Sequence, residues 1–203
     1  MKRTLMIAAG CILLTGGVNI AKGDSFIQLA LWPPIQLVDE DRDVTGVRLE
    51  LYGRNKEVSG VDFGIANETT GDFSGVGTGF VNYVGKDLYG IQWGLYCAAK
   101  GALSGWQSAV FARSGGDGTG FQNGIVCLSD HDFEGVQLSF IGQVRGYMSG
   151  LQMGAFNRSG SVEGIQIGLV NITEKMNGLQ LGLWNQINEK QNWKVLPLLN
   201  WNF

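Results

Sequence analysis

The segment EGIQIGLVNITEKMNGLQLGLWN, which runs from Glu163 to Asn185, contains one nine-residue pattern twice. Each copy reads small or polar residue, Gly, aliphatic, Gln, apolar, Gly, aliphatic, apolar and Asn. Ten copies of this pattern, spaced 14 or 15 residues apart, begin at Gly46, Gly60, Gly75, Gly90, Gly105, Gly120, Gly135, Gly150, Gly164 and Gly178. A unit this short cannot bury its own apolar face, so the spacing predicts a repeat protein whose neighbouring units stabilise one another.

Alternation within each copy predicts a β-strand. With the first glycine counted as position 0, positions +1, +3 and +5 are mostly apolar, and +2 and +4 are mostly Gln and Gly. A period of two residues with one apolar face is typical of a strand. Turn-forming stretches such as NETTGD from Asn67 and NRSGS from Asn157 follow the strands. The chain is therefore predicted to be all-β, with one strand-turn unit per repeat.

Two architectures can be built from this unit. In a β-solenoid each repeat forms one coil, the aliphatic side chains fill the interior and the Gln row faces outward. In an up-and-down outer-membrane β-barrel of about 11–12 strands, the aliphatic face would meet lipid, and Gln and Gly would line the lumen. Uniform spacing and an alternating run of only about 13 Å favour the solenoid. The apolar C-terminal stretch KVLPLLNWNF, which ends on Phe203, is typical of the barrel, and we retain the barrel as the alternative.

Four segments follow from this pattern. They are a signal peptide at 1–23, an N-terminal cap or strand at 24–43, ten tandem repeats at 44–188 and a C-terminal capping strand at 189–203. The leader is indicated by Lys2 and Arg3 before an apolar run, and by small residues just before Asp24. A lipoprotein reading, with acylation of Cys11, is the alternative use of this segment. Both readings predict an exported protein of the cell envelope, located in the outer membrane, at the cell surface or in the periplasm.

The charge balance limits the partners. Without residues 1–23 the chain carries 12 basic and 18 acidic residues, for a net charge of −6. Nucleic-acid binding requires clustered Lys and Arg that neutralise phosphates, so this class is excluded. No segment after the leader has the roughly 20 apolar residues of a membrane helix. Envelope or surface ligands, either carbohydrate or protein, are the expected partners, and association with the outer membrane stays open.

The register also predicts the state of the two remaining cysteines. Cys97 and Cys127 each lie seven residues after their repeat glycine, and Ala112 holds the same place in the unit between them. One strand per unit separates the two cysteines by about 9.5 Å. A disulfide requires Cα atoms within about 7 Å, so we predict two free thiols.

Little in the chain suggests catalysis or metal binding. His131, the single histidine, lies between Asp130 and Asp132 in a turn, and this group is neither a catalytic triad nor a complete metal shell. The glycine-rich stretch from Gly115 and the acidic run at 39–43 are better explained as turns than as calcium sites. We therefore predict no catalytic, cofactor-binding or metal-binding residues and no enzymatic activity.

The repeated amides form the one candidate binding face. This face comprises Gln92, Gln107, Gln122, Gln137, Gln152, Gln166 and Gln180. An exposed row of amides with small neighbours can bind a carbohydrate, a protein edge or another copy of the chain. The same assignment predicts that Leu181→Asp unfolds the protein, because it buries an unpaired carboxylate, and that Gln180→Asp is tolerated.

The pattern x-Gly-aliphatic-Gln-aliphatic-Gly-aliphatic-x-Asn resembles the surface-repeat proteins of spirochaetes and other Gram-negative bacteria. The lead-in QLALWPPIQLVDEDRDVTGVRLELYGRN and the ending LPLLNWNF are similar to the flanks of that family, so the resemblance covers about residues 28–203. It departs from the pattern in the middle repeats, at Ser108, Asn123 and Ser139. The resemblance implies an exported envelope or surface protein and brings no catalytic residues. We expect a non-enzymatic structural or binding scaffold, with a Gln- and Gly-lined channel as the alternative.

Overall fold

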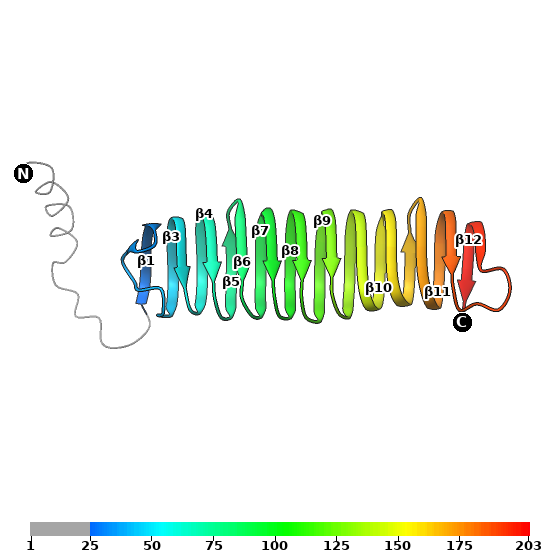
Figure 1. Cartoon of the computed structure of the whole chain (residues 1–203), viewed down its shortest axis with the longest axis horizontal. Helices are drawn as coiled ribbons and strands as arrows, with labels where there is room; N and C mark the ends of the chain where they lie inside the picture. The colour runs from blue at the N-terminus through cyan, green and yellow to red at the C-terminus, as the bar shows by residue number, and fades with distance from the viewer. Residues whose placement is uncertain (1–24) are drawn as a thin grey trace, which may run out of the picture.

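The computed structural model describes residues 25–203, and these form a β-solenoid (Figure 1). The strands are β1(Ser25–Trp32), β2(Ile35–Gln36), β3(Val44–Asn55), β4(Val58–Thr69), β5(Phe73–Thr78), β6(Val81–Val84), β7(Leu88–Ala99), β8(Leu103–Ser114), β9(Gly118–Ser129), β10(Phe133–Ile167), β11(Val170–Ile187) and β12(Val195–Asn202). The predicted leader and its Cys11 lie outside the described residues.

Parallel pairing between successive coils decides the architecture. Gly46 pairs with Gly60, Gly75 with Gly90 and Gly164 with Gly178, so each residue lies beside its equivalent 14 or 15 positions later. This register confirms the solenoid. The barrel alternative is wrong, because it requires antiparallel neighbours throughout. Antiparallel pairing within the described residues is confined to the two ends, where β1 pairs with β2 and β11 with β12.

A left-handed glycine begins each coil. The ten repeat glycines have φ between +120° and +149°, a region that side chains of L-residues rarely adopt. Space is as restrictive as conformation, because a Cβ on Gly90 would overlap the carbonyl oxygen of Gly75 in the coil before. The regular spacing of these glycines along the chain is therefore required by the backbone conformation and by the close approach of neighbouring coils.

The two ends of the stack differ. At the N-terminus β1 lies parallel to β3 as a first partial coil and ends at Trp32, as the two prolines that follow it predict. At the C-terminus β12 runs antiparallel along β11 and pairs Leu179 with Trp201. The edge of the sheet at this end is therefore the short strand β12, in which Pro197 offers no backbone donor to a further strand.

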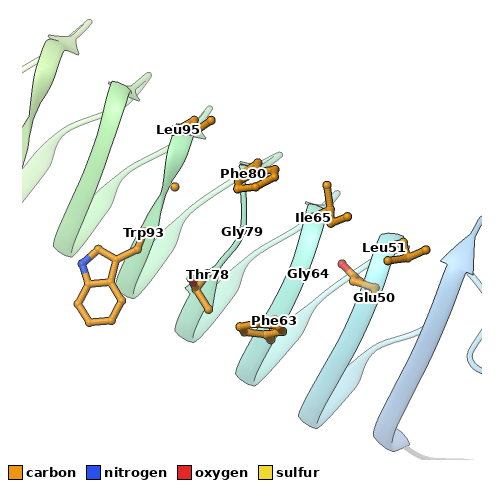
Figure 2. A pocket seen from close by; sticks show the side chains of 11 residues that line it. Glu50, Leu51, Phe63, Gly64, Ile65, Thr78, Gly79, Phe80, Trp93 and Leu95 are labelled. Atoms are coloured by element: carbon orange, nitrogen blue, oxygen red, sulfur yellow. The ribbon is translucent and has the colours of Figure 1, made fainter.

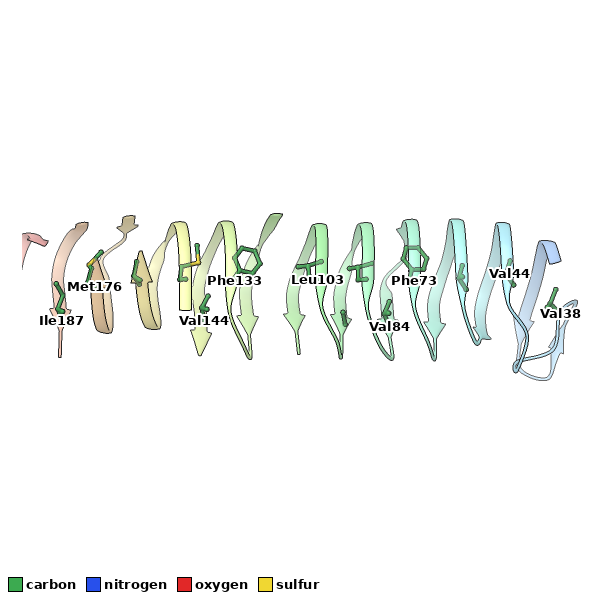
Figure 3. Close-up of a cluster of buried hydrophobic side chains, with 14 residues drawn as sticks. Val38, Val44, Phe73, Val84, Leu103, Phe133, Val144, Met176 and Ile187 are labelled. Carbon is green, nitrogen blue, oxygen red and sulfur yellow. The ribbon is translucent and has the colours of Figure 1, made fainter. Parts of the chain in front are cut away.

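The hydrophobic core is a narrow double row inside the coils (Figure 3). One row lies two positions before the repeat glycines and is apolar in every coil except that of Gly120. The other lies nine positions after the repeat glycines, where Val84, Ala99, Val144 and Ile187 are apolar and the remaining coils have polar residues; Val38 extends the core before the first repeat. The members are Val38, Val44, Val58, Phe73, Val84, Leu88, Ala99, Leu103, Phe133, Val144, Met148, Val162, Met176 and Ile187. All of them come from the turn-proximal half of the repeat, so the alternating Gln-containing half must be packed in another way.

The two cysteines are free, as predicted, and both are buried. Cys97 pairs with Ala112 in the next coil, and Ala112 pairs with Cys127 in the coil after that. Together with Ala109 these residues form a small second apolar cluster. Burial raises the pKa of both thiols to about 12, so they are held as unreactive neutral groups.

Candidate interaction face

The predicted Gln binding face is wrong, because its amides lie inside the solenoid. Gln92, Gln107, Gln122, Gln137, Gln152, Gln166 and Gln180 are each at most 2% exposed. The aliphatic side chains that were expected to fill the interior point outward instead, and Leu183 is 65% exposed. The inside and outside of the alternating half-repeat are therefore the reverse of the prediction, and the expected behaviour of Leu181→Asp and Gln180→Asp is reversed with them.

The amides can be buried because they satisfy one another. Nε2 of Gln122 donates to Oε1 of Gln107 at 2.9 Å, and the same bond recurs along the row to Gln180 at 2.7–2.8 Å. A second row, of Asn side chains seven positions after the repeat glycine, is bonded similarly, with Asn157 Nδ2 donating to Asn171 Oδ1 at 2.8 Å. Buried polar groups cost little when each finds a partner, and a stack of identical coils supplies that partner by symmetry.

Glycine at position +4 explains why the amides fill the interior. A Cβ on Gly94 would overlap the carbonyl oxygen of Gly79 and crowd the side-chain amide of Asn82, and Gly168 stands in the same relation to Gly154 and Asn157. Beside Asn82 and Asn157, the space between the Gln row and the Asn row is therefore too narrow for a side chain at position +4. The recurrence of glycine at position +4 indicates in the sequence that this side of the strand faces inward, because an outward-facing position does not require glycine.

The outward residues form what we call the apolar face, defined as positions +1, +3 and +5 of the ten repeats. None of these thirty positions holds a charged residue, and Thr78, Ser108 and Asn123 are the only polar ones. Phe63 is 61% exposed and Phe140 is 63% exposed. The face continues onto the terminal strands, where Ile27 pairs with Val47 and Leu199 with Leu181.

The middle of the apolar face carries an aromatic ridge. The rings of Trp93 and Trp106 meet edge to face at 5.4 Å, and those of Trp106 and Phe121 at 5.7 Å. Nε1 of Trp106 donates to Oδ1 of Asn123 at 2.8 Å, so the indole N–H and the amide oxygen satisfy each other on this surface. The polar side chain of Asn123 is thus bonded to the ridge and brings no charge onto the face.

A groove of about 500 Å³ lies on the apolar face over the N-terminal coils (Figure 2). Its walls are Leu51, Phe63, Ile65, Phe80, Trp93 and Leu95, and the buried Glu50 of the first coil also lines it (Figure 2). The inward-facing +4 glycines of three coils form its floor, and Thr78 occupies the row between Phe63 and Trp93 (Figure 2). A small residue between two large aromatic ones leaves the gap, so the groove is a recess with apolar walls.

An ion cluster lies inside the first coils, and the sequence analysis missed it. The guanidinium of Arg48 donates to both carboxylate oxygens of Asp62, with Nε 2.9 Å from Oδ1, and its Nη1 donates to the carbonyl of Glu68 at 2.9 Å. Glu50 Oε1 lies 3.3 Å from Arg48 Nε. Arg48 and Asp62 occupy successive +2 positions, the column that has Gly77 in the next coil and Gln from Gln92 onward, and the opposite charges on neighbouring coils indicate in the sequence that the two side chains pair.

The cluster holds more acid than base, which sets its protonation. Burial raises the pKa of Glu50 to about 8, against the attraction of Arg48 and with the help of repulsion from Asp62. Burial also raises the pKa of Asp62, although Arg48 opposes the shift. We assign the ionised pair to Arg48 and Asp62, which share two hydrogen bonds, and a protonated carboxyl to Glu50 below its raised pKa. The cluster is enclosed, so its structural role is to replace the amide row at this end.

The turn residues that sequence analysis considered are used structurally. Asp130, beside His131, forms ion pairs with Arg113 at 2.6 Å and with Arg145 at 2.9 Å. In the acidic run, Glu40 lies 3.6 Å from Arg54 and Asp43 lies 3.9 Å from Lys56. Among residues 25–203 no group of three or more His, Cys, Asp or Glu side chains is arranged to hold a metal ion.

Comparison of the chain with protein-family models, with curated proteins and with solved structures finds no match. The resemblance to surface-repeat proteins therefore stays a prediction from the sequence. Within the described part of the chain no helix is long and apolar enough to cross a membrane.

Proposed function

We propose that this protein is a non-enzymatic structural scaffold of the bacterial cell envelope, which is exported and associates with other envelope components through its apolar face. The observation that carries the proposal is the apolar face itself, uncharged over ten coils and exposed along the whole stack. Monomeric soluble proteins rarely expose contiguous apolar patches larger than about 300–600 Å², and larger ones mark interaction sites. The leader-like residues 1–23 support export.

The interior supports a mechanical role. Amide rows run through the coils and fix one register, because a shift of one residue would break every Gln–Gln bond at once. The buried Gln and Asn side chains of these rows bond mainly to their equivalents in neighbouring coils. A rod built in this way places the same apolar surface at each coil and holds it at a constant spacing.

Cell fractionation tests the proposal. A Gram-negative host producing the full chain should yield a shortened product in the envelope fraction, detected by mass spectrometry and by an antibody to the folded protein. A double variant, Leu169→Glu with Leu183→Glu, changes two exposed positions of the face. We expect this variant to be exported and to move to the soluble periplasmic fraction. Recovery of an unshortened chain from the cytoplasm, with the face variants distributed like the parent, would refute the proposal.

A further inference from the structure

We propose that the apolar face is the interface between two copies of this chain, which pack face to face as a two-fold dimer. This inference rests on the proposed function, because it names the partner of the same surface. It follows from three properties of the face, which are its size, its period and its lack of charge.

The size of the face matches what a stable dimer needs. Twelve strand rows spaced about 4.8 Å apart give a length of about 53 Å, and positions +1 to +5 give a width of about 13 Å. The face therefore covers about 700 Å² per copy, and a dimer would bury about 1,400 Å² in total, within the 1,200–2,000 Å² of specific protein interfaces. Fully buried interface cores are also the most apolar and charge-depleted part of such surfaces.

The period of the face selects a second copy over other proteins. Each column of side chains repeats at the strand spacing, and the columns at +3 and +5 run beside a line of +4 glycines, as in the groove over Gly64, Gly79 and Gly94. Columns interdigitate along their whole length only with a surface of equal period. A second solenoid has that period by identity, and two-fold symmetry places the same surface on both sides.

The charge distribution favours this partner over an anionic lipid surface. After residues 1–23 the net charge is −6, which repels anionic headgroups, whereas membrane-bound surfaces typically carry Lys and Arg around their apolar residues. Two copies can approach along the face because their charged residues lie off it. Ser108 and Asn123 near the centre bring no charge into the interface.

Sedimentation velocity of the purified chain from about 1 to 100 μM, without detergent, tests the dimer. The wild type should sediment as a dimer. A double variant with Val110→Glu and Ile125→Glu, at positions 45% and 54% exposed on the middle coils, should be monomeric. Dimerisation should weaken by more than about 100-fold, because like charges facing one another across an interface cost several kcal/mol. Leu128→Glu with Gln143→Glu adds the same charge on the outer side of the second strand of the same region and should leave the dimer unchanged.

Folding and lipid binding are measured on the same samples. Far-UV circular dichroism and the urea midpoint show whether each variant keeps the solenoid. Flotation with phosphatidylcholine vesicles, and with vesicles containing phosphatidylglycerol, reports lipid binding. A folded monomer that floats with vesicles would overturn the dimer and keep the scaffold proposal, since the face then meets lipid. A folded wild-type monomer that binds no vesicle would overturn the dimer and would also contradict the part of the proposed function that depends on the face. A dimer that is lost only in the variant with Leu128→Glu and Gln143→Glu would have the same two consequences.

Discussion

Replacement of Gln137 by Glu tests the interior position of the amide row more directly than any other single change. Gln137 is fully buried, its Nε2 donates to Gln122 at 2.8 Å, and its Oε1 accepts from Gln152 at 2.8 Å. Glu has the same shape but, when ionised, offers two acceptors. It would place an oxygen against the Gln122 oxygen and would bury a charge without a partner.

The expected loss is about 4 kcal/mol at pH 8. Burial commonly raises a carboxyl pKa by about 3 units, and each unit corresponds to about 1.36 kcal/mol. The sign follows from linkage, because a folded pKa above the unfolded value of about 4.3 means that stability falls as the pH rises between the two values. Below pH 4.3 the neutral acid donates its O–H to Gln122 and still accepts from Gln152, so most of the loss should disappear.

Gln143→Glu is the matched control, because it makes the same change in the same coil at an outward, partly exposed position. We expect it to cost less than about 0.5 kcal/mol at either pH. Urea unfolding at pH 4 and pH 8, followed by circular dichroism, measures both variants. Equal losses for the two variants, or a Gln137→Glu loss that does not depend on pH, would refute the buried amide row.

Three further outcomes follow from the structure. Gly105→Ala should lower the free energy of unfolding by at least about 2 kcal/mol, because φ is +135° there and the new Cβ would overlap a backbone oxygen. Thermal unfolding measures the loss, and Ser104→Ala, the neighbouring control, should be nearly neutral. Cys97 and Cys127 should not react with a thiol reagent at pH 8 until urea unfolds the chain; rapid reaction of the native protein would contradict their burial. Wild-type stability should contain a component that is lost as the pH rises from 4.5 towards about 8, and Glu50→Gln should flatten it; an unchanged pH profile would contradict the raised pKa of Glu50.

The coil spacing could be predicted from the sequence, but the direction of the side chains could not be predicted from hydrophobicity alone. The spacing of the repeat glycines predicts parallel stacking, and Cys97, Ala112 and Cys127 fall in one column as expected. The alternation of Leu181 with Gln180 is equally compatible with either face turned inward. Hydrophobic burial usually decides such cases, but here the interior beside the +4 glycines is too thin for branched side chains and is filled by amides that bond between coils.

The barrel alternative places Gln and Gly inside and the aliphatic residues outside, which is the observed orientation, although its strand pairing is wrong. In this repeat the direction of the side chains and the pairing of the strands must therefore be predicted independently. The Arg48 and Asp62 pair does not separate them from sequence alone, because opposite charges on neighbouring strands also pair on an exposed sheet face. The solenoid prediction places the aliphatic residues in the core, and it therefore does not predict the apolar face.

The inverted polarity connects the fold to the proposed association. Hydrogen bonds along each amide row hold the coils in register, and the main apolar cluster lies two positions before and nine positions after the repeat glycines, with a smaller cluster around Cys97 and Cys127. The aliphatic columns consequently make no contribution to packing inside the coil. Their exposure to water is unfavourable in free energy, and a partner surface that covers them removes this cost. A regular coil, such as those of Gly164 and Gly178, adds one residue to the core, one bond to each amide row and one row of about 4.8 Å to the apolar face. Stability of the rod and strength of association therefore rise together with the number of repeats, as expected for a quasi-one-dimensional array whose neighbours supply both.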